Sequence, residues 1–104
     1  MVSINEAAQH IGIDYLDDEM VRANLGRALD SAIYRLYGAV GRDVEVYLED
    51  DPRIDQLVLM YTEEAYDNHP GSAKQDAAKN HLRDILELQL RLELRTAKEG
   101  ESDV

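Results

Sequence analysis

The sequence predicts an all-α fold, a small bundle of about four helices with either a short β-strand or an extended arm at the C-terminal end. Two observations lead to this prediction. Apolar residues recur at helical spacing in several stretches, and residues that typically cap helices stand just before those stretches. A chain of 104 residues suits one domain. We expect that domain to span residues 1–98 and residues 99–104 to form a disordered tail, because this end is small, polar and uncapped.

The first helix is predicted from its capping signals. Ser3 and Glu6 have the spacing of a capping box, in which each side chain accepts a hydrogen bond from the backbone amide of the other residue. Gly12 is placed to end the helix shortly after His10, because glycine readily adopts the left-handed conformation that follows a helix.

The second helix has the clearest pattern in the chain. Asp17 is a good N-cap, and Asp18 and Glu19 suit the positive end of the helix dipole. The helix should end near Gly38. Its apolar stripe comprises Val21, Leu25, Ala28, Leu29, Ala32, Ile33 and Leu36.

Residues 38–51 are predicted to be a loop with a short extended piece at Val44, Val46 and Leu48, because β-branched residues at alternate positions suit a half-buried strand. Asp51-Pro52 then opens a third helix, since proline is well accepted at the first helical position. The buried stripe of this helix is predicted to be Ile54, Leu57, Val58, Tyr61 and Ala65.

The third helix should stop around residues 67–69, because Pro70 biases the residue before it away from helical angles. Ser72 and Gln75 form a second capping box that opens the last helix. Ala78, Leu82, Ile85 and Leu86 are predicted to continue its apolar side.

The leucine segment (residues 86–95) alternates leucine with polar or charged residues. Its leucines are Leu86, Leu88, Leu90, Leu92 and Leu94. An extended chain would place all five on one face, whereas a helix would divide them into two opposed stripes. We expect helix up to about Leu86 and extended chain after it, and we expect the five leucines to form an interface with another copy or a partner. The alternative is that they pack within their own chain against Val44, Val46 and Leu48 as a two-segment sheet.

Composition narrows the function classes. The chain carries 22 acidic and 11 basic residues, a net charge of −11, and residues 1–70 alone hold 15 acidic and 5 basic residues. This excess of acidic residues disfavours direct binding to nucleic acid, because phosphate contact needs clustered Lys and Arg. Cysteine is absent, which excludes disulfides and thiolate metal sites. No apolar run is long enough to span a membrane and no signal pattern begins the chain, so we expect a soluble, intracellular protein.

Catalytic and metal-binding residues are not apparent. His81, Asp84 and Glu87 share a helix face at a spacing that could hold a divalent cation, but no second cluster completes the coordination. Three groups of carboxylates stand at helix starts or in polar surroundings, where capping and solubility explain them better than catalysis: Asp17, Asp18 and Glu19; Glu49, Asp50 and Asp51; and Glu63, Glu64 and Asp67. We therefore expect no enzyme, no metal and no cofactor.

The layout of the chain resembles the head-tail connector proteins of tailed bacteriophages. The strings that carry the likeness are Asp51-Pro52-Arg53-Ile54 at the third helix, Tyr66-Asp67-Asn68-His69-Pro70-Gly71 at the turn, Ser72-Ala73-Lys74 at the last helix, and the run from Glu87 to Arg95. The run from Glu87 to Arg95 looks like the ending of members from phages and prophages of Gram-positive bacteria.

This resemblance implies a virion structural protein, present in the host cytoplasm during assembly. The identical subunits would form a ring, expected to be a dodecamer, that binds the portal protein on one side and a tail-side completion protein on the other. DNA would pass through the ring without specific binding, with Glu45, Glu49, Asp50 and Asp51 lining the channel or an outer surface. Two alternatives stay open: a small acidic protein-binding module that imitates the charge of DNA, and a metal-dependent enzyme around His81.

Overall fold

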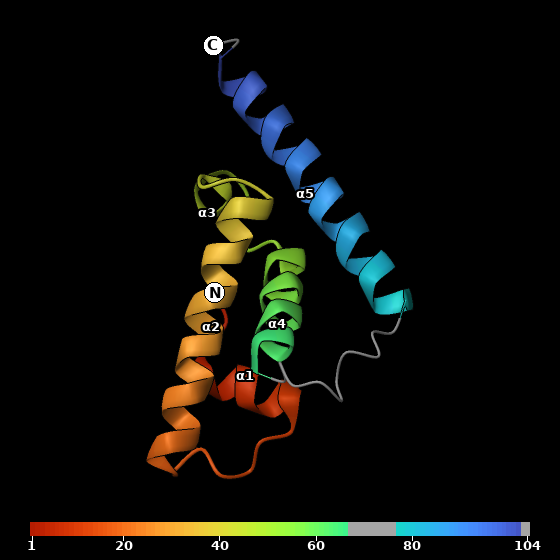
Figure 1. Cartoon of the computed structure of the whole chain (residues 1–104). Helices are drawn as coiled ribbons and strands as arrows, with labels where there is room; N and C mark the ends of the chain where they lie inside the picture. Colours follow the sequence, from red (N-terminus) through yellow and green to blue (C-terminus); the bar gives the residue numbers. More distant parts are fainter. Residues whose placement is uncertain (67–76, 103–104) are drawn as a thin grey trace.

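The computed structural model describes residues 1–66 and 77–102, and this part of the chain is helical and contains no strand (Figure 1). Its helices are α1 (Ile4–Ile11), α2 (Glu19–Ala39), α3 (Val44–Tyr47), α4 (Pro52–Tyr66) and α5 (Ala77–Ser102). The prediction of an all-α small bundle is confirmed.

The helix caps agree closely with the sequence. At α1, Ser3 Oγ accepts a hydrogen bond from the Glu6 amide at 3.2 Å, and Glu6 Oε1 accepts one from the Ser3 amide at 3.4 Å. Gly12 follows α1 with a φ of 88°, the left-handed conformation that glycine adopts without strain. At α2 the N-cap is Asp18 rather than Asp17, and Asp18 Oδ1 accepts from the amides of Met20 and Val21 at 2.9 and 3.2 Å.

The core lies mainly between α2 and α4, which run side by side, while α1 crosses one end of this pair (Figure 1). Most of the predicted apolar residues of both helices are buried, but Ala65 is exposed. Thr62 is fully buried, and its hydroxyl donates to the Val58 carbonyl at 2.7 Å, which satisfies the one polar group that it brings into the core. The buried residues of the α2–α4 pair are Leu25, Ala28, Leu29, Ala32, Leu36, Ile54, Leu57, Val58, Tyr61 and Thr62.

The prediction of an extended piece within residues 38–51 is wrong, because Val44–Tyr47 forms the short helix α3. The Asp43 carbonyl accepts from the amides of Val46 and Tyr47, which closes a helical turn. Val44 is fully buried and Val46 is largely exposed, whereas a strand would have turned both side chains to the same face. Three alternating apolar residues did not suffice to form a strand, since no neighbouring strand in the described part of the chain offers a partner.

The prediction of extended chain after Leu86 is also wrong. Helix α5 continues through the leucine segment to Ser102, so neither a C-terminal strand nor an extended arm is present there. Residues 99–102 are likewise helical, where the sequence suggested the start of a disordered tail. Leucine, glutamate, glutamine and arginine all have high helix propensity, and this outweighed the alternating order. The predicted capping box at Ser72 and Gln75 and the predicted stop before Pro70 lie outside the described residues.

Helix α5 packs beside the α2–α4 pair, and most of its contacts with the rest of the chain are with α4 and α3 (Figure 1). Within the described residues, none of the helices is both long and apolar enough to cross a bilayer.

Candidate interaction surface

The leucine segment is divided between two opposite sides of α5. Leu86, Leu90 and Leu94 are 6%, 0% and 4% exposed and belong to the hydrophobic core. Leu88 and Leu92 are 51% and 53% exposed. The division follows from helical geometry, because positions four apart share a face and positions two apart point about 200° away from each other. Of the five leucines predicted to form an interface, three are therefore covered by their own chain.

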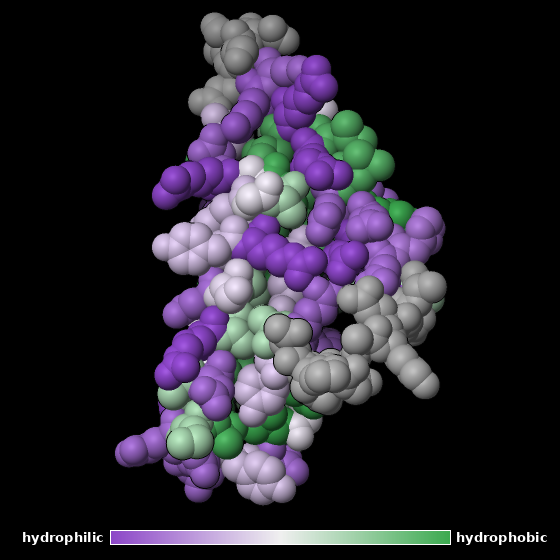
Figure 2. Space-filling view, viewed as in Figure 1, coloured by the Kyte–Doolittle hydropathy of each residue, from purple (hydrophilic) through white to green (hydrophobic). Residues whose placement is uncertain are grey.

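The outer face of α5 is defined here by its four exposed large apolar residues: Leu82, Ile85, Leu88 and Leu92. Leu82 and Ile85 were expected on the buried side together with Ala78, but all three are exposed. In Figure 2, hydrophobic side chains lie among hydrophilic ones along the edge of the molecule formed by α5. An amphipathic helix normally covers its apolar stripe, so a helix with a second apolar stripe has a surface suited to another protein.

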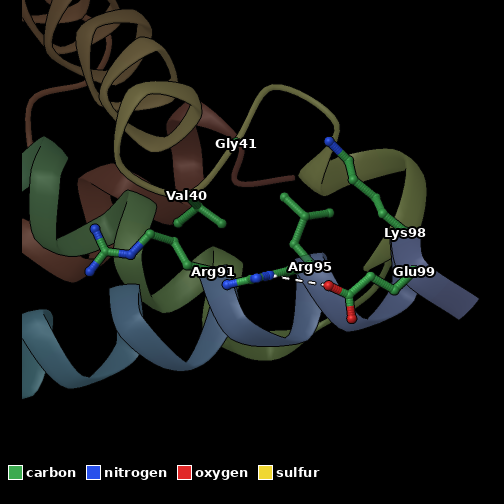
Figure 3. Close-up of a pocket in the computed structure, with 7 residues that line it drawn as sticks. Val40, Gly41, Arg91, Arg95, Lys98 and Glu99 are labelled. Carbon is green, nitrogen blue, oxygen red and sulfur yellow. Dashed lines mark hydrogen bonds and ion pairs between the residues drawn. The ribbon is translucent and has the colours of Figure 1, made fainter.

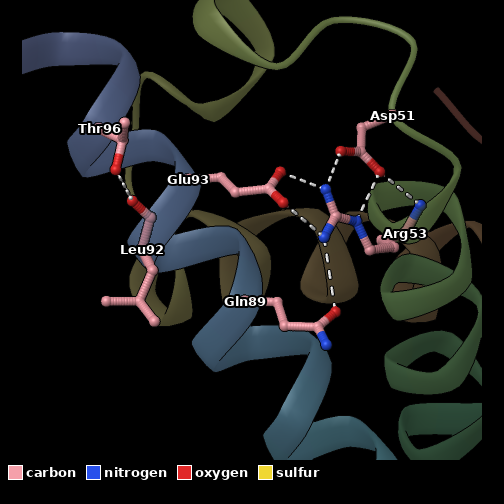
Figure 4. Close-up of polar contacts among 6 residues, drawn as sticks. All are labelled: Asp51, Arg53, Gln89, Leu92, Glu93 and Thr96. Carbon is pink, nitrogen blue, oxygen red and sulfur yellow. Dashed lines mark hydrogen bonds and ion pairs between the residues drawn. The ribbon is translucent and has the colours of Figure 1, made fainter. Parts of the chain in front are cut away.

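A cluster around Arg53 holds α5 against the start of α4 (Figure 4). Arg53 Nη2 lies 2.6 Å from Asp51 Oδ2, and Arg53 also forms an ion pair with Glu93 and contacts Gln89 of α5. The hydrogen bonds from Arg53 lower the pKa of Asp51, and the two carboxylates raise the pKa of Arg53. In the same view the Leu92 side chain points away from Arg53. The cluster thus fixes which side of α5 faces the body.

A second polar cluster joins α2, α4 and α5 along the same contact. Tyr61 donates a hydrogen bond to Glu87 Oε1 at 2.6 Å, and burial is the main cause of its raised pKa. Glu64 pairs with Arg35 at 2.5 Å and with Arg83 at 2.8 Å. The Arg35 guanidinium lies 4.3 Å from the centre of the Tyr61 ring, a cation–π contact. These bonds involve three helices, so they orient α5 as well as attach it.

Near its C-terminal half, α5 packs against the turn after α2. Gly41 has a φ of 149°, and a Cβ atom at this position would lie 2.5 Å from Leu94 Cδ2. Only glycine allows Leu94 to approach the backbone this closely. An open hollow beside this contact is lined by Val40, Gly41, Arg91, Leu94, Arg95, Lys98 and Glu99 (Figure 3).

The basic side chains of this hollow are partly engaged within the chain. Arg95 pairs with Glu99 at 3.2 Å and Lys98 pairs with Asp43 at 2.8 Å. Arg91 donates to the Ala39 carbonyl at 3.4 Å. These contacts reduce the positive charge available to an anion, so we assign no ligand to the hollow.

The four carboxylates singled out from the sequence have different surroundings. Asp51 is bound by Arg53, as described above, and is only partly exposed. Glu45 accepts a hydrogen bond from the Tyr37 hydroxyl at 2.7 Å, and this bond raises the pKa of Tyr37. Glu49 and Asp50 are exposed, and Asp50 has a positive φ of 65°. Three of the four thus present an acidic surface at the corner between α3 and α4.

Two of the three residues considered for metal binding have other contacts. Glu87 accepts the hydrogen bond from Tyr61, and Asp84 Oδ1 lies 3.6 Å from Arg83 Nη2. Among residues 1–66 and 77–102, no group of three or more His, Asp or Glu side chains is arranged to hold a metal ion. The structure therefore gives no support to a metal-dependent enzyme around His81.

Comparisons with known proteins do not identify the chain. No protein family model, no curated protein and no solved structure matches it.

Sequence reasoning missed the residues that orient α5. Arg53 and Glu93 each belong to a string that resembles the connector family, but they are 40 residues apart and nothing in the sequence indicates that they form an ion pair. Gly41 stands in a segment that was expected to be a loop, where a glycine needs no special explanation. The sequence allowed two conformations for the leucine segment, extended or helical. Only the helical one leaves the five leucines unequally exposed.

Proposed function

We propose that this protein is a head-tail connector of a tailed bacteriophage, a structural subunit of a ring that binds the portal and links the capsid to the tail. The observation that carries the proposal is the outer face of α5, which leaves Leu88 and Leu92 half exposed on a helix whose other side is already buried. The strings that resemble the connector family, from Asp51 to Ile54 and from Glu87 to Arg95, lie at the two ends of the Arg53 cluster that orients this helix.

A ring of identical subunits requires two different complementary patches on each subunit, because its contacts are head to tail. The outer face of α5 is one candidate patch. Candidates for the second are α2, where Met20 and Tyr34 are largely exposed, and α3, where Val46 is exposed beside Glu45 and Glu49. Exposed apolar residues at these places are consistent with a subunit that is completed by its neighbours.

The charge of the chain suits a protein through which DNA passes. A net charge of −11 repels the phosphate backbone, so a ring wall with this composition would not retain the DNA by nonspecific contacts. Glu49 and Asp50 are exposed and belong to the acidic surface at the corner between α3 and α4. This corner is a candidate for the channel wall as well as for an outer surface.

The test is assembly with the portal protein encoded next to this chain. We expect the two proteins to copurify and electron microscopy to reveal a ring on the portal. The double variant Leu88→Glu and Leu92→Glu should abolish the ring, while the matched control Tyr15→Glu, at an exposed residue outside α5, should not. The absence of a portal gene nearby, or a portal that never binds the protein, would contradict the proposal.

A second candidate function is a small acidic module that occupies a DNA-binding protein. The observation behind it is the excess of ten negative charges in residues 1–70, with 15 acidic and 5 basic residues. A pull-down that recovers a nuclease or a repressor and no portal, followed by displacement of that protein from DNA by this chain, would favour this function over the first.

A further inference from the structure

The outer face of α5 has the spacing of a short helix-pairing seam. Ile85, Leu88 and Leu92 follow one another at intervals of three and four residues, the intervals at which apolar residues meet between two paired helices. All three are exposed in the single chain. We propose that two copies of this protein pair through α5, with the two helices antiparallel and these residues in the seam.

The charged residues beside the seam can form ion pairs with the same residues of a second copy. Asp84 and Arg91 are two helical turns apart on the same edge of the seam, one toward each end. An antiparallel pair brings Asp84 of one copy beside Arg91 of the other, and the twofold symmetry makes this contact twice. One chain therefore supplies both partners of a reciprocal ion pair.

Both side chains are available for such a contact. Asp84 is 68% exposed, and its ion pair with Arg83 is long, at 3.6 Å. Arg91 is exposed, and its hydrogen bond to the Ala39 carbonyl is also long, at 3.4 Å. Contacts of this length at the surface contribute little, so both side chains can reorient toward a second copy.

The same charges select the direction and the register of the pair. A parallel arrangement would place Asp84 beside Gln89 and Arg91 beside Thr96, which provides no ion pair. An antiparallel pair shifted by one heptad would bring the two copies of Arg91 together, which is unfavourable. The favoured register places Ile85 of one copy against Leu88 of the other.

The seam is short, because His81 and Arg95 hold the next seam positions on either side. A contact of this size buries little surface, so the pair should be weak and should depend on protein concentration. A symmetric contact uses the same patch on both copies and is complete at two. It would cover the outer face of α5 in the free protein. In the proposed ring this face contacts another subunit, so the pair would have to open before the ring forms. That step rests on the proposed function, whereas the existence of the pair does not depend on it.

Sedimentation equilibrium over a range of concentrations tests the pairing. We expect a monomer–dimer equilibrium for the natural sequence and no dimer for Leu88→Glu with Leu92→Glu. Asp84→Arg alone and Arg91→Asp alone should each weaken dimerisation at least about tenfold, since two attractive contacts become repulsive. The two changes combined should restore it to near the natural level. The matched control Asp30→Arg, at an exposed residue of α2, should leave it unchanged.

A monomer at every concentration would overturn the inference. A dimer that survives the leucine changes, or one that the combined charge reversal fails to restore, would overturn it as well, because the pairing would then use another surface or another direction. Circular dichroism of each variant checks that α5 remains helical. A protein that stays monomeric yet forms rings on a portal refutes the pairing alone, and a dimer of this behaviour that never binds a portal refutes the proposed function alone.

Discussion

Leu90 and Leu88 are separated by one residue in the leucine segment, yet the structure assigns them opposite environments. Leu90 has no exposed surface and lies in the core, whereas Leu88 is half exposed on the outer face of α5. Replacing each by alanine in turn removes the same atoms from two different surroundings. The comparison therefore isolates the effect of burial.

The expected loss of stability follows from what each side chain contacts. Leu90→Ala removes buried atoms and leaves a cavity, which should lower the free energy of unfolding by about 3 kcal/mol. Leu88→Ala removes a side chain from the surface and places alanine in a helix, so its effect should stay within about 0.5 kcal/mol. In a domain of this size, a loss of about 3 kcal/mol lowers the melting temperature by roughly 12–24 °C.

Urea denaturation followed by circular dichroism measures both effects. It should be carried out at a protein concentration at which the chain is monomeric, so that pairing through Leu88 does not contribute. Similar losses for the two variants would refute the assignment, because that result is expected when all five leucines share one face of an extended segment. A larger loss for Leu88→Ala than for Leu90→Ala would refute it equally.

Three further predictions concern the residues that hold α5. Gly41→Ala should lower the free energy of unfolding by about 1–3 kcal/mol, because its Cβ would collide with Leu94 and its φ is positive; thermal denaturation measures this loss. Arg53→Ala should lower the free energy of unfolding by about 2 kcal/mol, because it leaves the partly buried carboxylate of Asp51 without its charged partner. Urea denaturation measures this loss, and an unchanged free energy of unfolding would mean that the cluster does not stabilise the fold. Because the pKa of Asp51 is lowered in the fold, its ion pair stabilises the protein at pH values above the ordinary aspartate pKa. This stabilisation is lost as the pH falls through the lower pKa of the folded state. The free energy of unfolding, measured by urea denaturation, should therefore decline in acid, and Asp51→Asn should make that decline shallower.

Local signals in the sequence were enough for most of the helices. The capping box of Ser3 and Glu6 and the glycine at position 12 are decided by residues within one turn, and the structure confirms them. The buried stripe of α4 was also correctly predicted apart from Ala65, since a helix packed on one side reveals that side by its spacing.

The leucine segment could not be resolved from sequence, because leucine at every second position fits one face of a strand and two faces of a helix equally well. The choice depended on what lies beside the segment. Arg53, 40 residues before Glu93, fixes the inner side of α5, and Gly41 makes room for Leu94. Contacts between such distant residues leave no periodic signal, so the exposed and buried leucines could be told apart only in the fold.

The accessibility of the outer face of α5 before and after assembly tests directly whether another subunit covers this face. The chain contains no cysteine, so Leu88→Cys and Leu90→Cys each introduce a single reactive thiol. In the dilute free protein, the thiol at position 88 should react rapidly with a maleimide and the thiol at position 90 slowly. On the portal, the thiol at position 88 should become protected. Equal labelling of position 88 in the free and assembled protein would contradict the claim that this face is covered by another subunit.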